Sequence, residues 1–341
     1  MKKKLSAREL GQWVDGLAAG ARVIGPRAQQ DKFAFDVIRG SDELRLDYDV
    51  TILPPRQFFQ PACETLLKFG PATGYQSCVD EQPFVLFGVH PYDIVAIRQM
   101  DAVFAQDNAD IRYIRRREAA TIVAADVQRE SSHVFAGWMG TSHVEDGFDV
   151  LITKIGESYL VDGRTEKGKN LMAGIRGAAD AGPEDLKARE KVWKSNRQRL
   201  RKHTLKAEPA RWPALLDAGY DHPVWKEKAE RCFSCGSCVL TCPTCYCFDV
   251  RDDVDWSLQA GARVRVWDGC MLSDFAKVAG NHNFRKDKAA RFRHRYYRKG
   301  KYVPSKTGGQ IACVGCGRCA TACVAKIANP VEVFNRLMEA D

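Results

Sequence analysis

Eleven of the thirteen cysteines of this 341-residue chain lie between positions 232 and 323. Eight of them form two runs with the same spacing, Cys-x2-Cys-x2-Cys-x3-Cys. The runs consist of Cys232, Cys235, Cys238 and Cys242, and of Cys313, Cys316, Cys319 and Cys323. This spacing is typical of ferredoxin-type loops that bind 4Fe–4S clusters, where the fourth cysteine of each run is a ligand of the other cluster. The sequence therefore predicts two 4Fe–4S clusters.

The same rule predicts which cysteines share a cluster. We expect one cluster on Cys232, Cys235, Cys238 and Cys323, and the other on Cys313, Cys316, Cys319 and Cys242. Gly236, Gly315 and Gly317 suit such tight loops because glycine adopts positive φ without a steric penalty. Val324 follows the second run where proline, as in Pro243 after the first run, is usual.

Two other metal chemistries fit these cysteines less well. A zinc ribbon uses two Cys-x2-Cys pairs, so two cysteines of each run would have no role. A radical-SAM motif can be extracted as Cys238-x3-Cys242-x2-Cys245. However, it takes two cysteines from the more specific pattern, and no repeating strand–helix barrel surrounds it.

Three cysteines near the runs are left over, Cys245, Cys247 and Cys270. They are candidate ligands of a third metal site, together with Asp268 or His282. Alternatively, they pack as small buried apolar side chains, which is common for free cysteine. Both interpretations stay open. Cys63 and Cys78 are far from the others in the sequence, and we expect them to be structural.

Composition indicates a globular protein with 45% hydrophobic and 28% charged residues. No apolar run approaches the length of a membrane span, and no apolar segment follows the basic start as in a signal peptide. Thirteen cysteines without these features favour metal ligands in a cytoplasmic protein over disulfides.

The formal net charge of +9 raises the question of whether the chain binds nucleic acid. The segment 285–302 alternates aromatic and basic residues, as single-strand binders do. Cations beside anionic clusters, or a basic face for an acidic redox partner, explain the same segment. Eight thiolates on two oxidised clusters would contribute about −4, so the corrected charge is about +5. Nucleic acid is therefore not an expected partner.

The pattern of apolar residues predicts an α+β domain over 1–183. Its expected strands are 83–89, 121–127, 149–156 and 157–163, the last two forming a hairpin, and its expected helix is 94–105. No strand is followed by GxGxxG or by a Walker loop, so we expect no flavin or nucleotide on this chain. His90 and Asp93 are expected to cap the start of the helix rather than to act as a catalytic pair.

The rest of the chain divides into a helical linker, 184–222, and a C-terminal domain, 223–341. A charged helix is expected over 184–206, with acidic residues first and basic residues last. The C-terminal domain is predicted to be mostly helical and ferredoxin-like, with a long insertion between the two cysteine runs. In that insertion we expect helices and an extended segment over 254–260, 262–267 and 272–279.

Taken together, these motifs resemble a known family. The segments that carry the resemblance are CFSCGSCVLTCPTCYCFDV, VWDGCMLSDFAKVAGNHNFR, RFRHRYYRKGKY, CVGCGRCATAC, ILPPRQFF and FVLFGVHPYDIVAIRQMD. They resemble the beta subunit of cytosolic sulfhydrogenases, which belong with the NAD(P)-linked nickel–iron hydrogenases. The chain is also similar to the A subunit of anaerobic sulfite reductase. Many members have Arg-Pro-Cys-Asp where this chain has His90-Pro91-Tyr92-Asp93, so a thiol is missing there.

The resemblance implies a non-catalytic electron-transfer subunit of an oxidoreductase complex, with two 4Fe–4S clusters. Its implied partners are an FAD- and NAD(P)-binding flavoprotein subunit and a catalytic subunit, of the hydrogenase type or alternatively of the sulfite reductase type. A stand-alone redox enzyme with its own substrate site is a further alternative.

Overall fold

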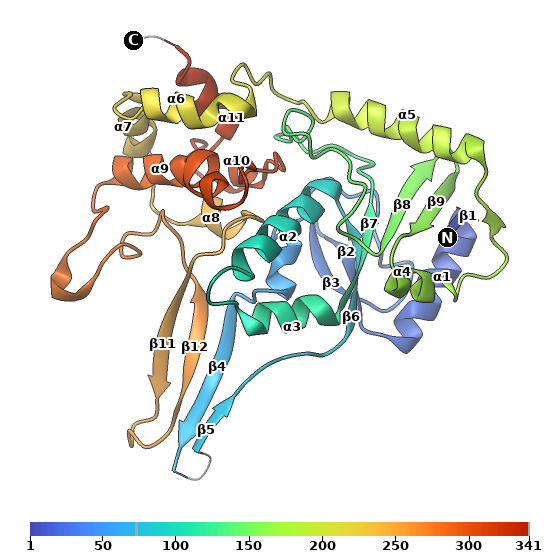
Figure 1. Cartoon of the computed structure of the whole chain (residues 1–341), viewed down its shortest axis with the longest axis horizontal. Coiled ribbons are helices and arrows are strands. Elements are labelled where there is room, and N and C mark those ends of the chain that lie inside the picture. The colour runs from blue at the N-terminus through green and yellow to red at the C-terminus, as the bar shows by residue number, and fades with distance from the viewer. Residues whose placement is uncertain (72–73, 340–341) are drawn as a thin grey trace.

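The computed structural model describes residues 1–71 and 74–339, and it contains both helices and strands (Figure 1). The strands are β1 (Lys2–Ser6), β2 (Val23–Gln29), β3 (Lys32–Ile38), β4 (Cys63–Gly70), β5 (Gly74–Ser77), β6 (Phe84–Val89), β7 (Ala120–Ala125), β8 (Val150–Ile155), β9 (Ser158–Gly163), β10 (Ala179–Asp180), β11 (Phe248–Val254) and β12 (Gly261–Trp267). The helices are α1 (Ala7–Gly20), α2 (Pro91–Phe104), α3 (Ile111–Ala119), α4 (Glu166–Met172), α5 (Pro183–Arg199), α6 (Trp212–Ala218), α7 (Val224–Glu230), α8 (Ser237–Leu240), α9 (Lys288–Tyr297), α10 (Arg318–Ala322) and α11 (Pro330–Arg336).

The N-terminal half is built on an eight-stranded mixed sheet in the order β10-β1-β9-β8-β7-β6-β2-β3. The four central strands, β8, β7, β6 and β2, are parallel to one another. The remaining pairs of the sheet are antiparallel. All six residues of β6 are buried, as in central strands covered on both faces. Side chains of β6 alternate between an apolar cluster with α1 and one with α2 and α3.

Most of the elements predicted in this half are confirmed. Strands β6, β7, β8 and β9 match the expected segments, and β8 and β9 form the expected hairpin. The expected helix 94–105 is α2, which begins earlier, at Pro91. The expected position of His90 and Asp93 at the helix start is confirmed, since His90 is the N-cap residue of α2 and Asp93 lies in its first turn. The His90 side chain makes no capping hydrogen bond, however, and the carboxylate of Asp93 pairs with Arg318.

The charged helix is confirmed as α5, but it ends at Arg199 rather than near 206. It ends there because Leu200 and Leu205 are buried and draw the chain off the surface into the core. Helix α5 lies against β8 and β9. The domain boundaries at 183 and 222 stay predictions.

A second sheet, in the order β11-β12-β4-β5, projects from the body of the molecule (Figure 1). It pairs β4, from the N-terminal half, with β12, from the insertion between the cysteine runs. We call these four strands the β-arm. The predicted extended segment 262–267 is confirmed as β12. The expected helices at 254–260 and 272–279 are wrong. Residues 255–260 form the turn between the paired strands β11 and β12, and 272–279 form bends and turns with an isolated bridge at Lys277 and a 3-10 turn that begins at Ala279.

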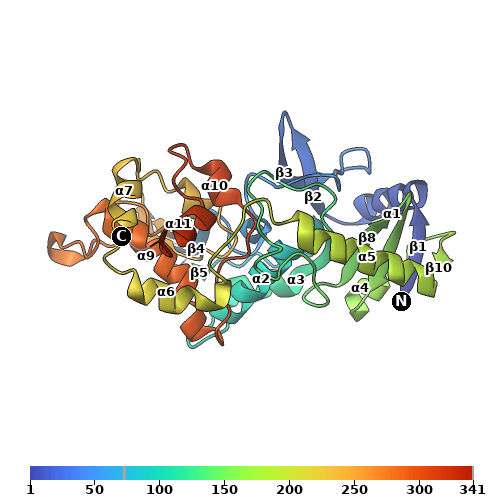
Figure 2. The ribbon, with the colours of Figure 1, turned by 90° about the horizontal axis from the view of Figure 1, so that it is seen from above.

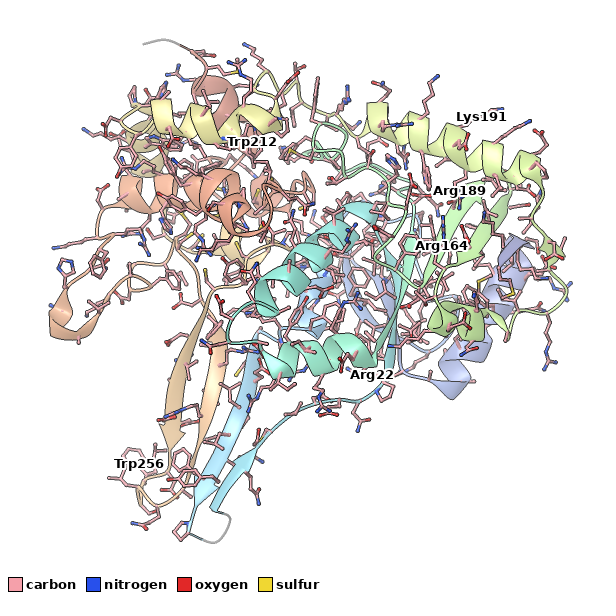
Figure 3. The ribbon with its side chains drawn as sticks, viewed as in Figure 1. Arg22, Arg164, Arg189, Lys191, Trp212 and Trp256 are labelled. Atoms are coloured by element: carbon pink, nitrogen blue, oxygen red, sulfur yellow. The ribbon has the colours of Figure 1, made fainter. Side chains whose placement is uncertain are left out.

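The C-terminal part consists of short helices around a core of its own (Figure 2). Helix α7 ends at Glu230, two residues before Cys232. Helix α9 is followed directly by a π-helical turn over Arg298–Tyr302. Such turns are rare and occur often at functional sites. The rings of Trp212 and Phe334 stack at 3.6 Å between centroids in the centre of this core, and Figure 3 shows Trp212 at the start of α6.

Candidate metal centres

Two cavities in the C-terminal part are each lined by four cysteines. The inner cavity, with an empty volume of about 460 Å³, is lined by Cys242, Cys313, Cys316 and Cys319. The outer cavity, about 360 Å³, is lined by Cys232, Cys235, Cys238 and Cys323. Each cavity thus takes three cysteines from one run and the fourth from the other run. These are the two combinations that the sequence predicts.

The two runs have the same backbone conformation at equivalent positions. Gly236 and Gly317 follow the second cysteine of their runs, with φ values of 74° and 80°, and each precedes a short helix. Ser234 and Gly315, one residue before that cysteine, also have positive φ. These left-handed residues turn each loop sharply enough for three cysteines to line one cavity.

The second run is packed tightly against the N-terminal half. The Gly315 carbonyl accepts a hydrogen bond from the Phe135 N–H at 2.8 Å, and the Val314 carbonyl accepts one from the Thr141 hydroxyl at 2.7 Å. A Cβ on Gly317 would lie 2.5 Å from the carbonyl atoms of His133. The glycines therefore permit a close approach as well as a turn.

Two buried cations line the inner cavity, Arg295 and Lys299. The ammonium of Lys299 donates to the Thr244 hydroxyl at 2.7 Å. Burial alone would lower the pKa of Lys299, but its interactions with Cys242 and Cys245 outweigh burial and raise this pKa. The guanidinium of Arg295 donates to the carbonyl of Cys238, a residue that lines the outer cavity, at 3.4 Å. Arg295 thus lies between the two groups of cysteines.

The outer cavity has a different lining. Its other walls are apolar or small, and no charged side chain lines it among the residues that the structure describes. Backbone N–H groups of Ser234 and Ile327 donate to the sulfurs of Cys232 and Cys323, each at 3.4 Å. Cys235 is exposed, and hydrogen bonds from Ser237 lower its pKa. Hydrogen bonds to sulfur of this kind tune iron–sulfur clusters.

Burial makes most of these thiols hard to ionise. Burial raises the pKa of Cys313 and of Cys238 to about 12, and it raises the pKa of Cys316 and of Cys319 as well. Metal ligands are thiolates, so metal binding must release these protons. The buried cations Arg295 and Lys299 favour the thiolate form.

The donor set fits a cluster better than a single ion. Within residues 1–71 and 74–339, no three His, Cys, Asp or Glu side chains converge closely enough to hold one metal ion. A zinc ion draws its four thiolates to about 2.3 Å from one point, whereas a cubane spreads them around a larger core. Four cysteines around each cavity correspond to the second arrangement.

The three remaining cysteines line neither cavity. Cys245 lies against Cys242, and a hydrogen bond from its thiol holds the pKa of Cys242 well below the ordinary value. Cys270 is buried, and burial raises its pKa to about 11. The two residues considered as additional ligands of a third site have other surroundings. The carboxylate of Asp268 accepts a hydrogen bond from the Gly269 N–H, and His282 is exposed beside Phe284. A third metal site stays a prediction.

The sequence did not reveal the role of Arg318, inside the second run. Its guanidinium is 2% exposed and donates two hydrogen bonds of 2.7 Å to the carboxylate of Asp93, and two more to Thr51. It joins the second run to the start of α2. The only available signal was its position, where the first run has Ser237. Cys63 and Cys78 lie on or beside the strands of the β-arm.

Comparisons with known proteins agree with this geometry. Residues 231–327 match a family model described as a 4Fe-4S dicluster domain. Over 336 residues the chain is 34% identical to sulfhydrogenase 2 subunit beta of Pyrococcus furiosus, a match that covers 98% of each chain. None of the helices in the described residues combines the length and apolarity required to span a membrane.

Proposed function

The chain belongs to the sulfhydrogenase beta-subunit family, and we therefore propose that it is the iron–sulfur electron-transfer subunit of a cytoplasmic multi-subunit oxidoreductase. It passes electrons between a flavoprotein subunit that binds FAD and NAD(P)H and a catalytic subunit of the hydrogenase type. The observation that carries the proposal is the pair of four-cysteine cavities in the second half of the chain. The sulfhydrogenase relative favours the hydrogenase type over the sulfite reductase type.

In this proposal the outer cavity holds one 4Fe–4S cluster through Cys232, Cys235, Cys238 and Cys323. The inner cavity holds the other through Cys242, Cys313, Cys316 and Cys319. When bound, each cluster accepts and returns one electron at low potential.

The protein residues have three tasks around these cavities. Trp212, Phe334 and Phe135 cover the inner cavity with apolar surface and exclude water from it. Arg295 and Lys299 place buried positive charge beside the thiolates. The N–H groups of Ser234 and Ile327 stabilise negative charge on the sulfurs of the outer cavity.

Substitution of one cysteine in each cavity tests the proposal. In the assembled complex, Cys235→Ala or Cys316→Ala should abolish electron flow from NAD(P)H to the terminal acceptor. The diaphorase activity of the flavoprotein subunit, measured with an artificial dye, should persist. The matched control is Cys63→Ala, which removes an exposed thiol from the β-arm and should leave both activities intact. Unchanged electron flow in either cavity variant would refute the assignment.

Iron and acid-labile sulfide measured on the anaerobically purified chain test the number of clusters. About eight of each per chain correspond to two clusters, and about twelve correspond to a third on Cys245, Cys247 and Cys270. Zinc without sulfide would contradict electron transfer altogether.

A further inference from the structure

Two large apolar side chains are exposed over the outer cavity. Phe233 is 69% exposed and Val324 is 70% exposed, and both line this cavity. Each follows directly on a cysteine of the cavity, Cys232 or Cys323. Val324 is also the position where such a run ordinarily has proline. An exposed apolar cluster indicates a contact surface more often than an isolated apolar residue does.

Exposed cations surround this apolar pair. The guanidinium of Arg231 donates to the Ala325 carbonyl at 3.0 Å, and the ammonium of Lys288 donates to the Cys232 carbonyl at 2.9 Å. Lys326 is exposed two residues after Val324. No carboxylate in the described part of the chain forms an ion pair with any of these three cations.

The neighbouring carboxylates do not cancel this charge. Asp287 accepts hydrogen bonds from the N–H groups of Ala289 and Ala290 at the start of α9, and Glu332 pairs with Lys228. Glu230, at the end of α7, is the exposed acid closest in sequence. The surface is therefore a small apolar centre with a basic rim, and we call it the outer patch (Phe233, Val324, Arg231, Lys288 and Lys326).

The outer patch also lies where the metal site reaches the surface. Cys235 is the one exposed cysteine among the eight that line the two cavities, and it belongs to the outer cavity. The cysteines of the inner cavity are buried or half-buried. Electron exchange between proteins requires a short separation between redox centres. Of the two cavities, the outer one offers that short separation at a surface.

We propose that the outer patch docks a small acidic electron-carrier protein of the ferredoxin type, which exchanges electrons with the site in the outer cavity. This inference rests on the proposed function. An apolar centre of two side chains with a basic rim suits this occupant, because transient redox encounters use small contacts, whereas permanent subunit interfaces are larger and more apolar. A basic rim attracts an acidic carrier and makes its association dependent on salt.

The test uses the full chain, purified anaerobically, and a plant-type [2Fe–2S] ferredoxin as the acidic probe. Binding is measured with both proteins oxidised, so that no electron moves, and electron transfer from the reduced ferredoxin is measured by stopped flow. Lys326→Glu should weaken binding about tenfold at low salt and reduce its salt dependence. Phe233→Ala should slow electron transfer several-fold.

Matched controls make comparable changes away from the patch: Lys191→Glu reverses an exposed charge on α5, and Trp256→Ala removes an exposed aromatic ring at the tip of the β-arm (Figure 3). Neither control should change binding or rate. Equal effects of Lys326→Glu and Lys191→Glu, or binding that does not depend on salt, would overturn the proposal.

Three further outcomes distinguish failure of this proposal from failure of the proposed function. A chain without iron and sulfide would refute both. A chain that contains its clusters and is reduced by dithionite, but does not bind ferredoxin, would overturn the docking proposal alone. Protection of the loops 232–237 and 323–327 from hydrogen exchange by another subunit in the native complex would also overturn it, because a permanent subunit would then occupy the patch.

Discussion

Lys299 offers a direct test of how the protein sets the properties of the inner site. Its side chain is buried, lines the inner cavity, and forms no ion pair with a carboxylate among the described residues. In Lys299→Met a side chain of similar length loses its charge. Thr244, which accepts the lysine hydrogen bond, keeps its own bond to the Ala312 carbonyl at 2.8 Å. The substitution therefore removes one positive charge with little change in packing.

The magnitude follows from the position of Lys299 in the wall of the inner cavity. For a charge that lines a cluster site we take a separation on the order of 7 Å from the cluster centre. At this separation and an effective dielectric constant of about 20, one unit charge interacts with one electron by about 2.4 kcal/mol. Since about 2.3 kcal/mol corresponds to 100 mV per charge, Lys299→Met should lower the reduction potential of the inner cluster by about 100 mV.

The assay is a redox titration of the two clusters followed by electron paramagnetic resonance. The outer cluster should shift much less, because Lys299 does not line the outer cavity. Lys301→Met is the matched control. It removes the same charge two residues further on, where the ammonium pairs with Asp217 at the surface, and it should move neither potential by more than about 20 mV. A rise in the inner potential, or an equal fall in both, would refute the reasoning.

Three other substitutions test the stability of the fold. Burial raises the pKa of Asp126 to about 6. Between about pH 4 and pH 6 only the folded state keeps this proton, so the free energy of unfolding falls as the pH rises. In urea unfolding, Asp126→Asn should therefore raise the free energy of unfolding by about 3 kcal/mol at pH 8 and by almost nothing at pH 4. Gly317→Ala, whose added methyl group would clash with His133, should lower the free energy of unfolding by more than 3 kcal/mol. Gly308→Ala, at a similar φ but in open space, should lower it by about 1 kcal/mol. Equal losses in the two variants would contradict the close approach of Gly317 to His133. Arg318→Met should cost about 3–5 kcal/mol by leaving Asp93 buried and unpaired, and adding Asp93→Asn should recover part of the loss in thermal unfolding.

The cysteine spacing was sufficient to predict which cysteines line each cavity, because the spacing itself is the geometric requirement. The buried strand at 84–89 and helix α2 were equally accessible, since a continuous apolar run and a 3.6-residue period are local signals. The expected helices of the insertion failed for the opposite reason. Strand β11 is exposed along its whole length, and its conformation depends on pairing with β12, which itself pairs with β4 almost two hundred residues earlier.

The roles of the charged residues were only partly predictable. The basic segment 285–302 indicated cations near the metal site, and Arg295 and Lys299 do line the inner cavity. The sequence did not distinguish these two from the exposed cations of the same segment, because that depends on which face of α9 and of its π-helical turn is buried. The pairing of Arg318 with Asp93 joins residues 225 positions apart, and no local pattern marks it.

The exchange of cysteines between the two runs has a consequence for biogenesis. Cys242 belongs to the cavity of the second run, and Cys323 belongs to that of the first. When only the first run has been synthesised, neither cavity therefore has all four of its cysteines. Both cavities can be completed only after the second run has been synthesised, because the outer cavity needs Cys323 and the inner cavity needs three further cysteines of that run. A truncated chain that ends within the insertion consequently has no four-cysteine cavity in which to retain a cluster, so each site requires both runs.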